Sequence, residues 1–423
     1  MFSVKKIAKH SLIQNTFFLS IIKILDLILP LITIPYLTRI LDVNSFGILV
    51  ILISSYSMAN VLTDFGFGLS GPYYISTNRD NKKNVNRYLS SVILIKSLLA
   101  IAAILCTTTY LSISKEINQI DHFTYILIGL IILSFAFQIQ WFFLGIEKMK
   151  SITILASISK VSYFAFIFIF VPFFRNINSI LFCTLVSNFI TTLLYFKFTK
   201  KEGYSLVKIN LIDIKNSFKD SFSFFISRLA VNLSTTSNGI IIGTFISPYS
   251  AAIYGVAEKI YNAAISLVVP LSNAMYPYMA RNKNHTLFMK IVILLFFLSI
   301  IGAFIGYIIS PWFFINVFGE KYKPSIYIFN YFLVMIPINT ISILYGYSAF
   351  SIIDKPYIPN YTVVISSIIY ILLIIILYMC SLLTISNLML LLITIDTITL
   401  IIRISIFHFL WRKRQRGKRN TIK

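Results

Sequence analysis

The sequence predicts an all-α integral membrane protein with about twelve transmembrane helices. Hydrophobic residues make up 57% of the 423 positions and charged residues only 12%, roughly half the charged share of a soluble domain. A chain of this composition cannot hide its apolar side chains in a water-soluble core, so its solvent is lipid. The apolar residues gather in runs near the ~20 residues that span a bilayer, and basic residues alternate between the loops that join the runs.

Twelve apolar runs are long enough to cross a membrane. The first follows three lysines (Lys5, Lys6 and Lys9), as in a signal peptide. It is too long for a signal sequence and lacks a small-residue cleavage site, so we expect a retained helix. The predicted spans lie near 12–37, 46–69, 88–110, 122–144, 152–172, 178–198, 220–246, 250–278, 286–310, 325–350, 358–379 and 388–410.

The basic residues are distributed unevenly over the two membrane faces. Loops on the side of the N-terminus hold 26 of the 37 Lys and Arg residues, and loops on the other side hold five. This is the positive-inside pattern, which predicts that both termini are cytoplasmic. The net charge of +23 is therefore explained by topology rather than by nucleic acid. The tail "WRKRQRGKRN" (411–420) fits a topological anchor, with a patch for RNA or anionic lipid as the alternative.

The stretch "TDFGFGLSGP" (63–72) matches two nucleotide-binding patterns in letters only. Asp64-Phe65-Gly66 spells a kinase tripeptide, and the three glycines fit G-x-G-x-x-G spacing. A dinucleotide loop needs a strand before it, a helix after it and an acid about 20 residues on. Here a helix-length apolar run precedes the glycines and a polar loop follows. We expect a glycine-rich helix end that carries an acid inside the membrane.

Residues for catalysis or metal binding form no recognisable cluster. The three cysteines lie inside or at the edges of spans, and the four histidines are scattered without ligand spacing. No disulfide framework, metal site, cofactor or catalytic nucleophile is predicted.

Ten ionisable residues fall inside the predicted spans. Facing lipid, each costs roughly 2.5–3.5 kcal/mol, so the set must pair internally or line a water-filled cavity. The ten are Lys23, Asp26, Asp64, Lys96, Lys160, Arg228, Glu258, Lys259, Asp396 and Arg403.

Helical spacing separates pairs from single charges. Lys23 and Asp26 are three residues apart, and Asp396 and Arg403 are seven apart, so each pair shares one helix face. Lys96, Lys160 and Arg228 have no acid nearby in the sequence, which favours a cavity for them.

Two spans also carry polar stripes at helical spacing. Such stripes either line a cavity or join neighbouring helices. The stripes are Arg228, Asn232, Thr235 and Gly239 in span seven, and Glu258, Asn262, Ser266, Pro270 and Asn273 in span eight.

The chain divides into two halves of six spans each. The longest polar interval is 197–220, and short links after the first span of each half (38–50 and 243–260) resemble each other weakly. An even number of spans per half predicts a parallel repeat, with the substrate between the halves. The predicted domains are an N-terminal bundle (1–205), a C-terminal bundle (206–411) and a basic cytoplasmic tail (412–423).

Four motifs together resemble one transporter family. They are "PLITIPYLTRILDVNSFGILV" (30–50), "DFGFGLS" (64–70), "QWFFLGIEKMKSI" (140–152) and "YGVAEKI" (254–260). In this order they resemble the Wzx-type polysaccharide transporters of the multidrug/oligosaccharidyl-lipid/polysaccharide exporter superfamily. The matching positions include Arg39, Asp64, Glu147 with Lys148, and Glu258 with Lys259.

The resemblance implies two six-helix bundles around a central V-shaped cavity in the bacterial cytoplasmic (inner) membrane. It implies flipping of undecaprenyl-diphosphate-linked oligosaccharide repeat units from the cytoplasmic to the periplasmic leaflet. The product would feed assembly of O-antigen or capsule, with a polysaccharide polymerase and chain-length machinery as further partners.

A lipid diphosphate is anionic, so surplus bases in a cavity suit it, and an acid whose pKa burial raises suits a coupling proton. The expected cavity residues are Arg39, Lys96, Lys160, Arg228, Asn232, Lys259 and Asn262. The ion-coupling candidates are Asp26, Asp64, Glu258 and Asp396.

Three other functions stay open at this point. A multidrug cation exporter of the same superfamily favours an acidic, aromatic cavity, against the basic surplus here. A lipid II flippase differs only in the sugar it carries. A membrane polymerase or glycosyltransferase usually has a large outer loop with catalytic acids, whereas the outer loops here are short.

Overall fold

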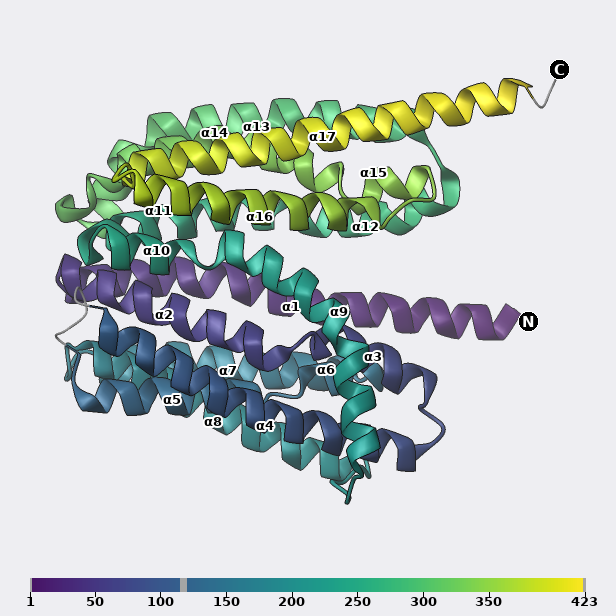
Figure 1. Cartoon of the computed structure of the whole chain (residues 1–423), viewed down its shortest axis with the longest axis horizontal. Helices are drawn as coiled ribbons and strands as arrows, with labels where there is room; N and C mark the ends of the chain where they lie inside the picture. Colours follow the sequence, from purple (N-terminus) through teal and green to yellow (C-terminus); the bar gives the residue numbers. More distant parts are fainter. Residues whose placement is uncertain (1, 115–119, 421–423) are drawn as a thin grey trace. The chain divides into compact units, whose positions relative to one another are not determined.

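The chain is built from helices throughout the residues that the structure describes. The computed structural model describes residues 2–114 and 120–420, and every regular element in these two ranges is a helix (Figure 1). The chain divides into two compact units, Met1–Asn232 and Leu233–Lys423. The domain limits predicted at residues 205 and 411 stay predictions, because compactness alone does not mark where a repeat ends.

The first unit contains nine helices, the last of which ends just beyond the unit. Short polar side chains begin several of them: Asp42, Asn81 and Asn176 each accept a hydrogen bond from the backbone N–H three residues on. The helices are α1 (Phe2–Ile40), α2 (Val43–Asp64), α3 (Phe67–Thr77), α4 (Lys82–Ile113), α5 (His122–Ala136), α6 (Gln140–Gly145), α7 (Met149–Phe170), α8 (Ile177–Lys201) and α9 (Leu211–Thr235).

The second unit repeats this order of long and short helices. Ser247 and Asn284 begin two of its helices in the same way. The helices are α10 (Asn238–Phe245), α11 (Pro248–Ser266), α12 (Val268–Asn282), α13 (His285–Phe313), the π-helix η2 (Phe314–Phe318), the 3₁₀-helix η3 (Glu320–Tyr322), α14 (Ser325–Leu344), α15 (Tyr347–Ile352), α16 (Ile358–Met379) and α17 (Ile385–Asn420).

Eleven helical segments of the described ranges are long and apolar enough to cross a membrane. They coincide with eleven of the twelve predicted runs, so the all-helical membrane class with about twelve spans is confirmed. The remaining run, 220–246, is broken into α9 and α10. Helix α9 carries several charged and hydroxyl residues, which lowers its apolar content below that of its neighbours. The predicted cytoplasmic location of the termini stays a prediction.

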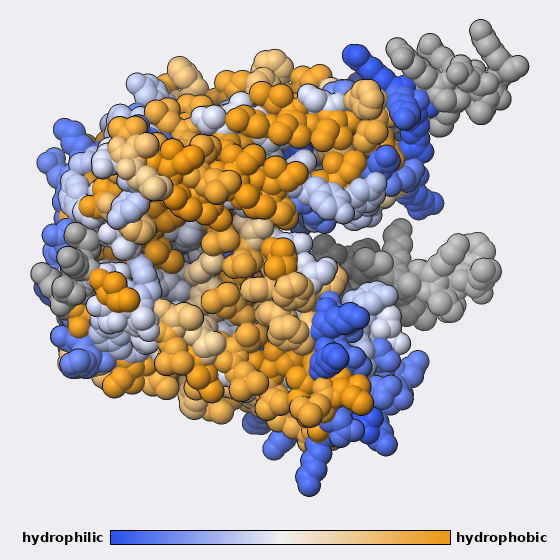
Figure 2. Space-filling view, viewed as in Figure 1, coloured by the Kyte–Doolittle hydropathy of each residue, from blue (hydrophilic) through white to orange (hydrophobic). Residues whose placement is uncertain are grey.

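The surface of each unit has the apolar character that a lipid solvent requires. On the face in view, Figure 2 shows apolar side chains along the middle of the helices and hydrophilic ones at their ends. Helix α13 is the extreme case, because Phe304 is 63% exposed, Ile308 is 61% exposed and Trp312 is 65% exposed. Such side chains are stable on a surface only where hydrocarbon replaces water.

A left-handed break separates α2 from α3. Phe65 has φ 46° and Gly66 has φ 78°. A left-handed conformation costs a non-glycine residue roughly 1–2 kcal/mol, so packing must hold Phe65 in place. Its ring stacks on Phe218 and Phe225 of α9, with centroids 4.4 and 4.6 Å away. The break therefore places the Phe65 ring against one face of α9.

The backbones of the break and α9 approach closely at Gly66. A Cβ atom there would lie 2.7 Å from the Phe225 nitrogen and 2.8 Å from the Ser221 carbonyl oxygen. One turn further along, the Ser70 and Ser221 hydroxyls are 2.7 Å apart and hydrogen-bonded. The predicted role of these glycines in close helix packing is thus visible at Gly66, where no larger residue fits.

We expect Gly66→Ala to destabilise the protein strongly, because it adds a left-handed strain of about 1–2 kcal/mol to a clash with backbone atoms that cannot rotate away. The matched control is Gly302→Ala in α13, where an added Cβ meets nothing within 4 Å. Thermal unfolding of the detergent-solubilised protein measures both. Equal melting temperatures for the two variants would contradict the packing argument.

Candidate functional site

The candidate site surrounds Asp64, the last residue of α2. The Arg228 guanidinium of α9 donates to Asp64 Oδ2 at 2.9 Å. The backbone N–H of Gly68 points to the same oxygen at 3.4 Å. A Cβ on Gly68 would lie 3.1 Å from Arg228 Nη1. The absence of a side chain at Gly68 therefore leaves room for the guanidinium at its present position.

Lys96 of α4 adds a second base to this group. Its side chain is buried, with 3% of the residue exposed, and it lies within electrostatic range of both Asp64 and Arg228. In the described part of the chain no carboxylate lies within ion-pair distance of Lys96. Asp64, Lys96 and Arg228 therefore form a group with one basic side chain more than its single carboxylate balances; we call it the Asp64 group.

The ion pair is only partly shielded from solvent. The side chain of Arg228 is 43% exposed and that of Asp64 is 20% exposed. One turn further along α9, the Asn232 side chain donates to the backbone carbonyl oxygen of Arg228 at 2.9 Å. A half-exposed guanidinium keeps free donor positions, because Arg has five N–H groups and the carboxylate takes one.

Helices α3 and α6 pack closely against each other. A Cβ on Gly71 of α3 would lie 2.4 Å from the Trp141 ring, and a Cβ on Gly145 of α6 would lie 2.7 Å from Ile75 Cβ. Each helix thus presents a glycine to a large side chain of the other. The Trp141 and Phe143 side chains are buried in the core of the first unit.

Lys160 was expected to face a cavity, but an acid from a distant part of the chain pairs with it. Lys160 of α7 donates to Asp26 of α1. Lys23 lies 3.9 Å from the other Asp26 oxygen, so the predicted Lys23–Asp26 pairing is the looser of the two contacts. The Asp26 carboxylate therefore contacts two lysines. The expected role of Asp26 in ion coupling and that of Lys160 in substrate binding stay predictions.

In the second unit, Glu258 ends a chain of hydrogen bonds. The Tyr254 hydroxyl donates to Glu258 Oε1 at 3.0 Å, and Asn238 Nδ2 donates to the Tyr254 oxygen at 3.1 Å. The Tyr370 hydroxyl donates to the side-chain oxygen Oδ1 of Asn238. Tyr254, Tyr370 and Asn238 are buried, so these bonds are sheltered from solvent.

Asp396 belongs to a neighbouring group and is not directly paired with Arg403. Asn339 Nδ2 lies 2.7 Å from Asp396 Oδ2 and 2.7 Å from the Tyr261 oxygen. Arg403 instead donates to Thr362 Oγ1 at 2.9 Å and to the Ser342 carbonyl at 2.9 Å. The spacing of seven residues correctly predicted that Asp396 and Arg403 share one helix face. Each of them, however, has neutral hydrogen-bond partners instead of the other charge. Asn339, Tyr254 and Tyr261 carried no signal in the sequence beyond their polarity.

The other expected cavity residues lie on exposed helix surfaces, and of these Lys259 is within electrostatic range of Glu258. Arg39, Lys259 and Asn262 are exposed on their own helices. Glu147 binds Arg79 at 3.0 Å and Lys148 binds Glu202 at 3.2 Å, so these two motif residues connect turns. In the basic tail, the side chains from 416 onward lie outside the described residues, as does Lys115.

The second unit has a counterpart of the Arg79–Glu147 contact. Asp354 follows the short helix α15, as Glu147 follows α6, and both residues have φ near 60°. Lys283 donates to Asp354 and to the Ser351 carbonyl, and Arg414 lies 3.0 Å from the second Asp354 oxygen. The Lys283 hydrogen bond and the nearby Arg414 charge lower the pKa of Asp354. Its carboxylate is therefore ionised at neutral pH.

Comparison with known sequences gives a consistent set of relatives. The sequence model of the family described as "Polysaccharide biosynthesis protein" matches residues 12–283. A Shigella dysenteriae protein described as "Putative O-antigen transporter" is 25% identical over 336 residues, which cover 78% of this chain and 84% of that protein. A protein of Escherichia coli (strain K12) with the same description is 28% identical over 270 residues, or 64% of this chain and 65% of that protein.

Solved structures share the fold. The lipid II flippase MurJ in an inward closed conformation matches with a TM-score of 0.69 and 15% identity, over 95% of this chain and 87% of that one. An inward-facing multidrug resistance MATE family transporter of the MOP superfamily matches with a TM-score of 0.66 and 13% identity, over 90% and 98% of the two chains.

A double-mutant cycle tests the Asp64–Arg228 pair. We expect Asp64→Ala and Arg228→Ala each to lower stability by about 1–2 kcal/mol, a range that allows for their partial exposure. The double variant should lose less than the sum, because neither Asp64 nor Arg228 is then left behind without the other. Thermal or denaturant unfolding of the purified protein gives the coupling energy.

The control cycle is Arg79→Ala with Glu147→Ala, a pair at 3.0 Å whose side chains are 46% and 63% exposed. Its coupling should be smaller, in the range of exposed pairs, about 0.2–1 kcal/mol. Additive losses at Asp64 and Arg228 would show that the pair is not energetically coupled.

Proposed function

Because this chain belongs to the polysaccharide biosynthesis protein family, we propose that it moves lipid-linked oligosaccharide repeat units across the membrane. The two relatives compared above are both described as putative O-antigen transporters. The chain is accordingly a multi-pass transporter and not an enzyme. The finer proposal is flipping of an undecaprenyl-diphosphate-linked unit from the cytoplasmic to the periplasmic leaflet of the inner membrane. Delivery to a polysaccharide polymerase and chain-length proteins stays a prediction.

The observation that supports this proposal most directly is the basic excess of the Asp64 group. The substrate head is a diphosphate, which cannot enter hydrocarbon without partners for its negative charge. Arg228 is half exposed and holds Asp64 by a single hydrogen bond. A phosphate oxygen is an equally good acceptor for a guanidinium, so the diphosphate can take the donors that Asp64 leaves open.

Lys96 supplies the positive charge that makes binding of the diphosphate favourable. With Asp64 and Arg228 alone, an arriving anion would meet a neutral pair. The buried Lys96 beside them leaves a positive excess in a region of low dielectric, where a charge is felt more strongly than in water. A cation exporter would instead need carboxylates in excess, and the Asp64 group has the opposite balance.

We further propose that Glu258 and Asp396 are the sites of ion coupling. Both carboxylates lie in spans of the second unit and are held by neutral donors, Tyr254 and Asn339. Neutral partners allow a carboxyl group to gain or lose a proton without breaking an ion pair. Asp26 and Asp64 instead form ion pairs with basic partners, which a change of protonation would break.

The first test uses a strain that lacks this protein. We expect it to lose surface polysaccharide and to accumulate lipid-linked oligosaccharide on the cytoplasmic face, measured in inverted membrane vesicles. The sugars of that intermediate identify the cargo and separate O-antigen, capsule and peptidoglycan precursors. Normal polymer together with new sensitivity to cationic drugs would contradict the proposal and favour multidrug export.

The electrostatic part is tested at Lys96. We expect Lys96→Gln to reduce export by roughly 10- to 150-fold, because one charge-assisted hydrogen bond contributes about 1.5–3 kcal/mol. Lys96→Arg should retain most of the export because it keeps the charge. The control is Lys290→Gln, which removes an exposed charge from α13. Full export by a folded Lys96→Gln protein would refute the role of the Asp64 group.

The coupling proposal is tested by Glu258→Gln and Asp396→Asn, which preserve shape but cannot ionise. We expect each variant to respond less to a pH gradient imposed across vesicles that contain it, with substrate binding unchanged. If transport by both variants depended on the pH gradient as in the wild type, neither Glu258 nor Asp396 would be the coupling site.

A further inference from the structure

We propose that the groove between α16 and α17 binds the prenyl chain of the lipid-linked substrate. This inference rests on the proposed function, because it assigns a place to the tail of the same molecule. It concerns the second unit alone, whereas the Asp64 group lies in the first.

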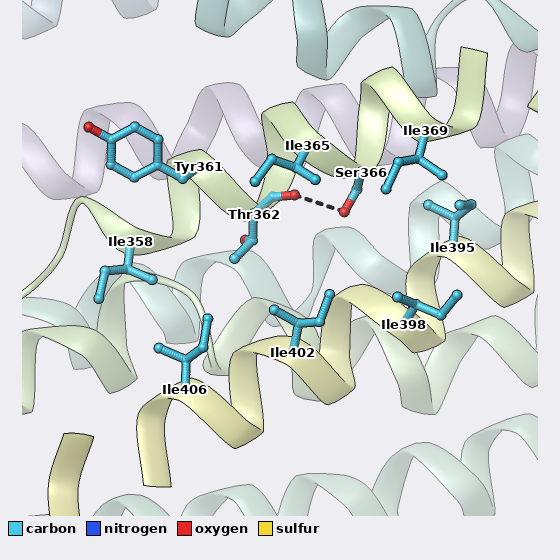
Figure 3. A pocket seen from close by; sticks show the side chains of 10 residues that line it. All are labelled: Ile358, Tyr361, Thr362, Ile365, Ser366, Ile369, Ile395, Ile398, Ile402 and Ile406. Atoms are coloured by element: carbon cyan, nitrogen blue, oxygen red, sulfur yellow. Dashed lines mark hydrogen bonds between the residues drawn. The ribbon is translucent and has the colours of Figure 1, made fainter. Parts of the chain in front are cut away.

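The groove is a hollow of about 170 Å³ on the surface of the second unit. Since a water-sized group takes about 30 Å³, this space holds five or six such groups, about one five-carbon isoprene unit. Figure 3 shows the two antiparallel helices with their side chains facing each other across the hollow. The walls are formed mainly by Ile358, Ile365 and Ile369 of α16 and by Ile398, Ile402 and Ile406 of α17.

The two small hydroxyl groups in the groove are already hydrogen-bonded within the protein. The Ser366 hydroxyl donates to the Thr362 carbonyl at 2.8 Å, and it lies 2.6 Å from Thr399 Oγ1. Thr362 Oγ1 donates to the Pro359 carbonyl at 2.7 Å and accepts from Arg403 at 2.9 Å. Tyr361, the third polar residue of the groove, is 65% exposed, and none of the side chains that line the groove is charged. The occupant is therefore a hydrocarbon chain and not a sugar or a phosphate.

The spacing of the isoleucines favours a branched chain. Ile398, Ile402 and Ile406 follow each other at one turn of α17, a rise of about 6 Å per step. Their β-branched side chains are stiff, so the groove has a ribbed wall with a repeat of one helical turn. A polyprenyl chain carries a methyl branch on every fourth carbon of its main chain, a repeat of the same order. A straight acyl chain has no branch to place between the ribs.

One end of the groove lies next to basic residues. The groove ends at Ile358 and Ile406 (Figure 3). Lys355 stands three residues before Ile358, and Arg412 and Lys413 follow Ile406 on the exposed surface of α17. An apolar groove that runs toward a basic end suits an amphiphile with an anionic head, which is the chemistry of a polyprenyl diphosphate.

The test uses the full-length protein in phospholipid nanodiscs with undecaprenyl diphosphate that carries a benzophenone on its tail. After irradiation, mass spectrometry locates the labelled peptides. We expect label on α16 and α17, and about a tenfold loss of that label in Ile402→Trp, a loss in the range set by the filling of an apolar pocket. The matched control is Ile401→Trp, since Ile401 is 56% exposed and does not line the groove.

A second pair covers the case in which Ile402→Trp does not fold. Ile365→Trp fills the groove from the other helix, and Ile368→Trp, at a position that is 53% exposed and outside the groove, is its control. Untagged undecaprenyl phosphate should compete for the label, and phosphatidylglycerol should not. Equal competition by phosphatidylglycerol would mean that any membrane lipid fills the groove, and equal labelling of all four variants would mean that the tail binds elsewhere; either result overturns the inference.

Failure of this inference is distinguishable from failure of the proposed function. The wild-type protein and Ile402→Trp are both expressed in the strain that lacks the protein. If the wild type restores export and Ile402→Trp restores it equally, with unchanged labelling, only the groove assignment is wrong. If the strain shows no accumulation of lipid-linked oligosaccharide at all, the proposed function itself is wrong.

Discussion

The contact between Arg228 and Asp64 is the constraint around which the first unit is arranged. A charge inside a membrane protein must find its partner within the protein, and here the partners come from α2 and α9. The absence of a side chain at Gly68 leaves room for the guanidinium at its present position, and α9 approaches most closely where Gly66 has none. The left-handed break, the Phe65 ring and the Ser70–Ser221 hydrogen bond hold α9 against α2 and α3 beside this ion pair.

The sequence predicts well what the bilayer itself imposes. Length and apolar content predict the spans because lipid demands about 20 apolar residues wherever a helix crosses. Partners across the fold could not be predicted, since Asp64 and Arg228 are 164 residues apart and Asp26 and Lys160 are 134 apart. Helical spacing reveals only neighbours on one helix, which is why Lys160 looked unpaired. Asn339 and Tyr254 escaped notice because a neutral polar residue has no pattern of its own until an acid is placed beside it.

The two units share an order of elements but use their charges differently. In the first unit the carboxylates Asp26 and Asp64 bind lysine or arginine. In the second, Glu258 and Asp396 bind tyrosine and asparagine, and Arg403 binds hydroxyl and carbonyl oxygens. Equivalent scaffolds therefore carry an ionic interior in one half and a hydrogen-bonded interior in the other. This difference is the physical basis for assigning the anionic head and the coupling ion to different halves.

The left-handed pair Phe65–Gly66 has a mechanical consequence. The helical hydrogen bonds are interrupted at this pair, so α2 and α3 are two separate helices rather than one. The Asp64 carboxylate accepts from Arg228 of α9 at 2.9 Å, and it faces the Gly68 amide of α3 at 3.4 Å. One side chain at the break therefore touches all three helices, so a change in its charge acts on α2, α3 and α9 together.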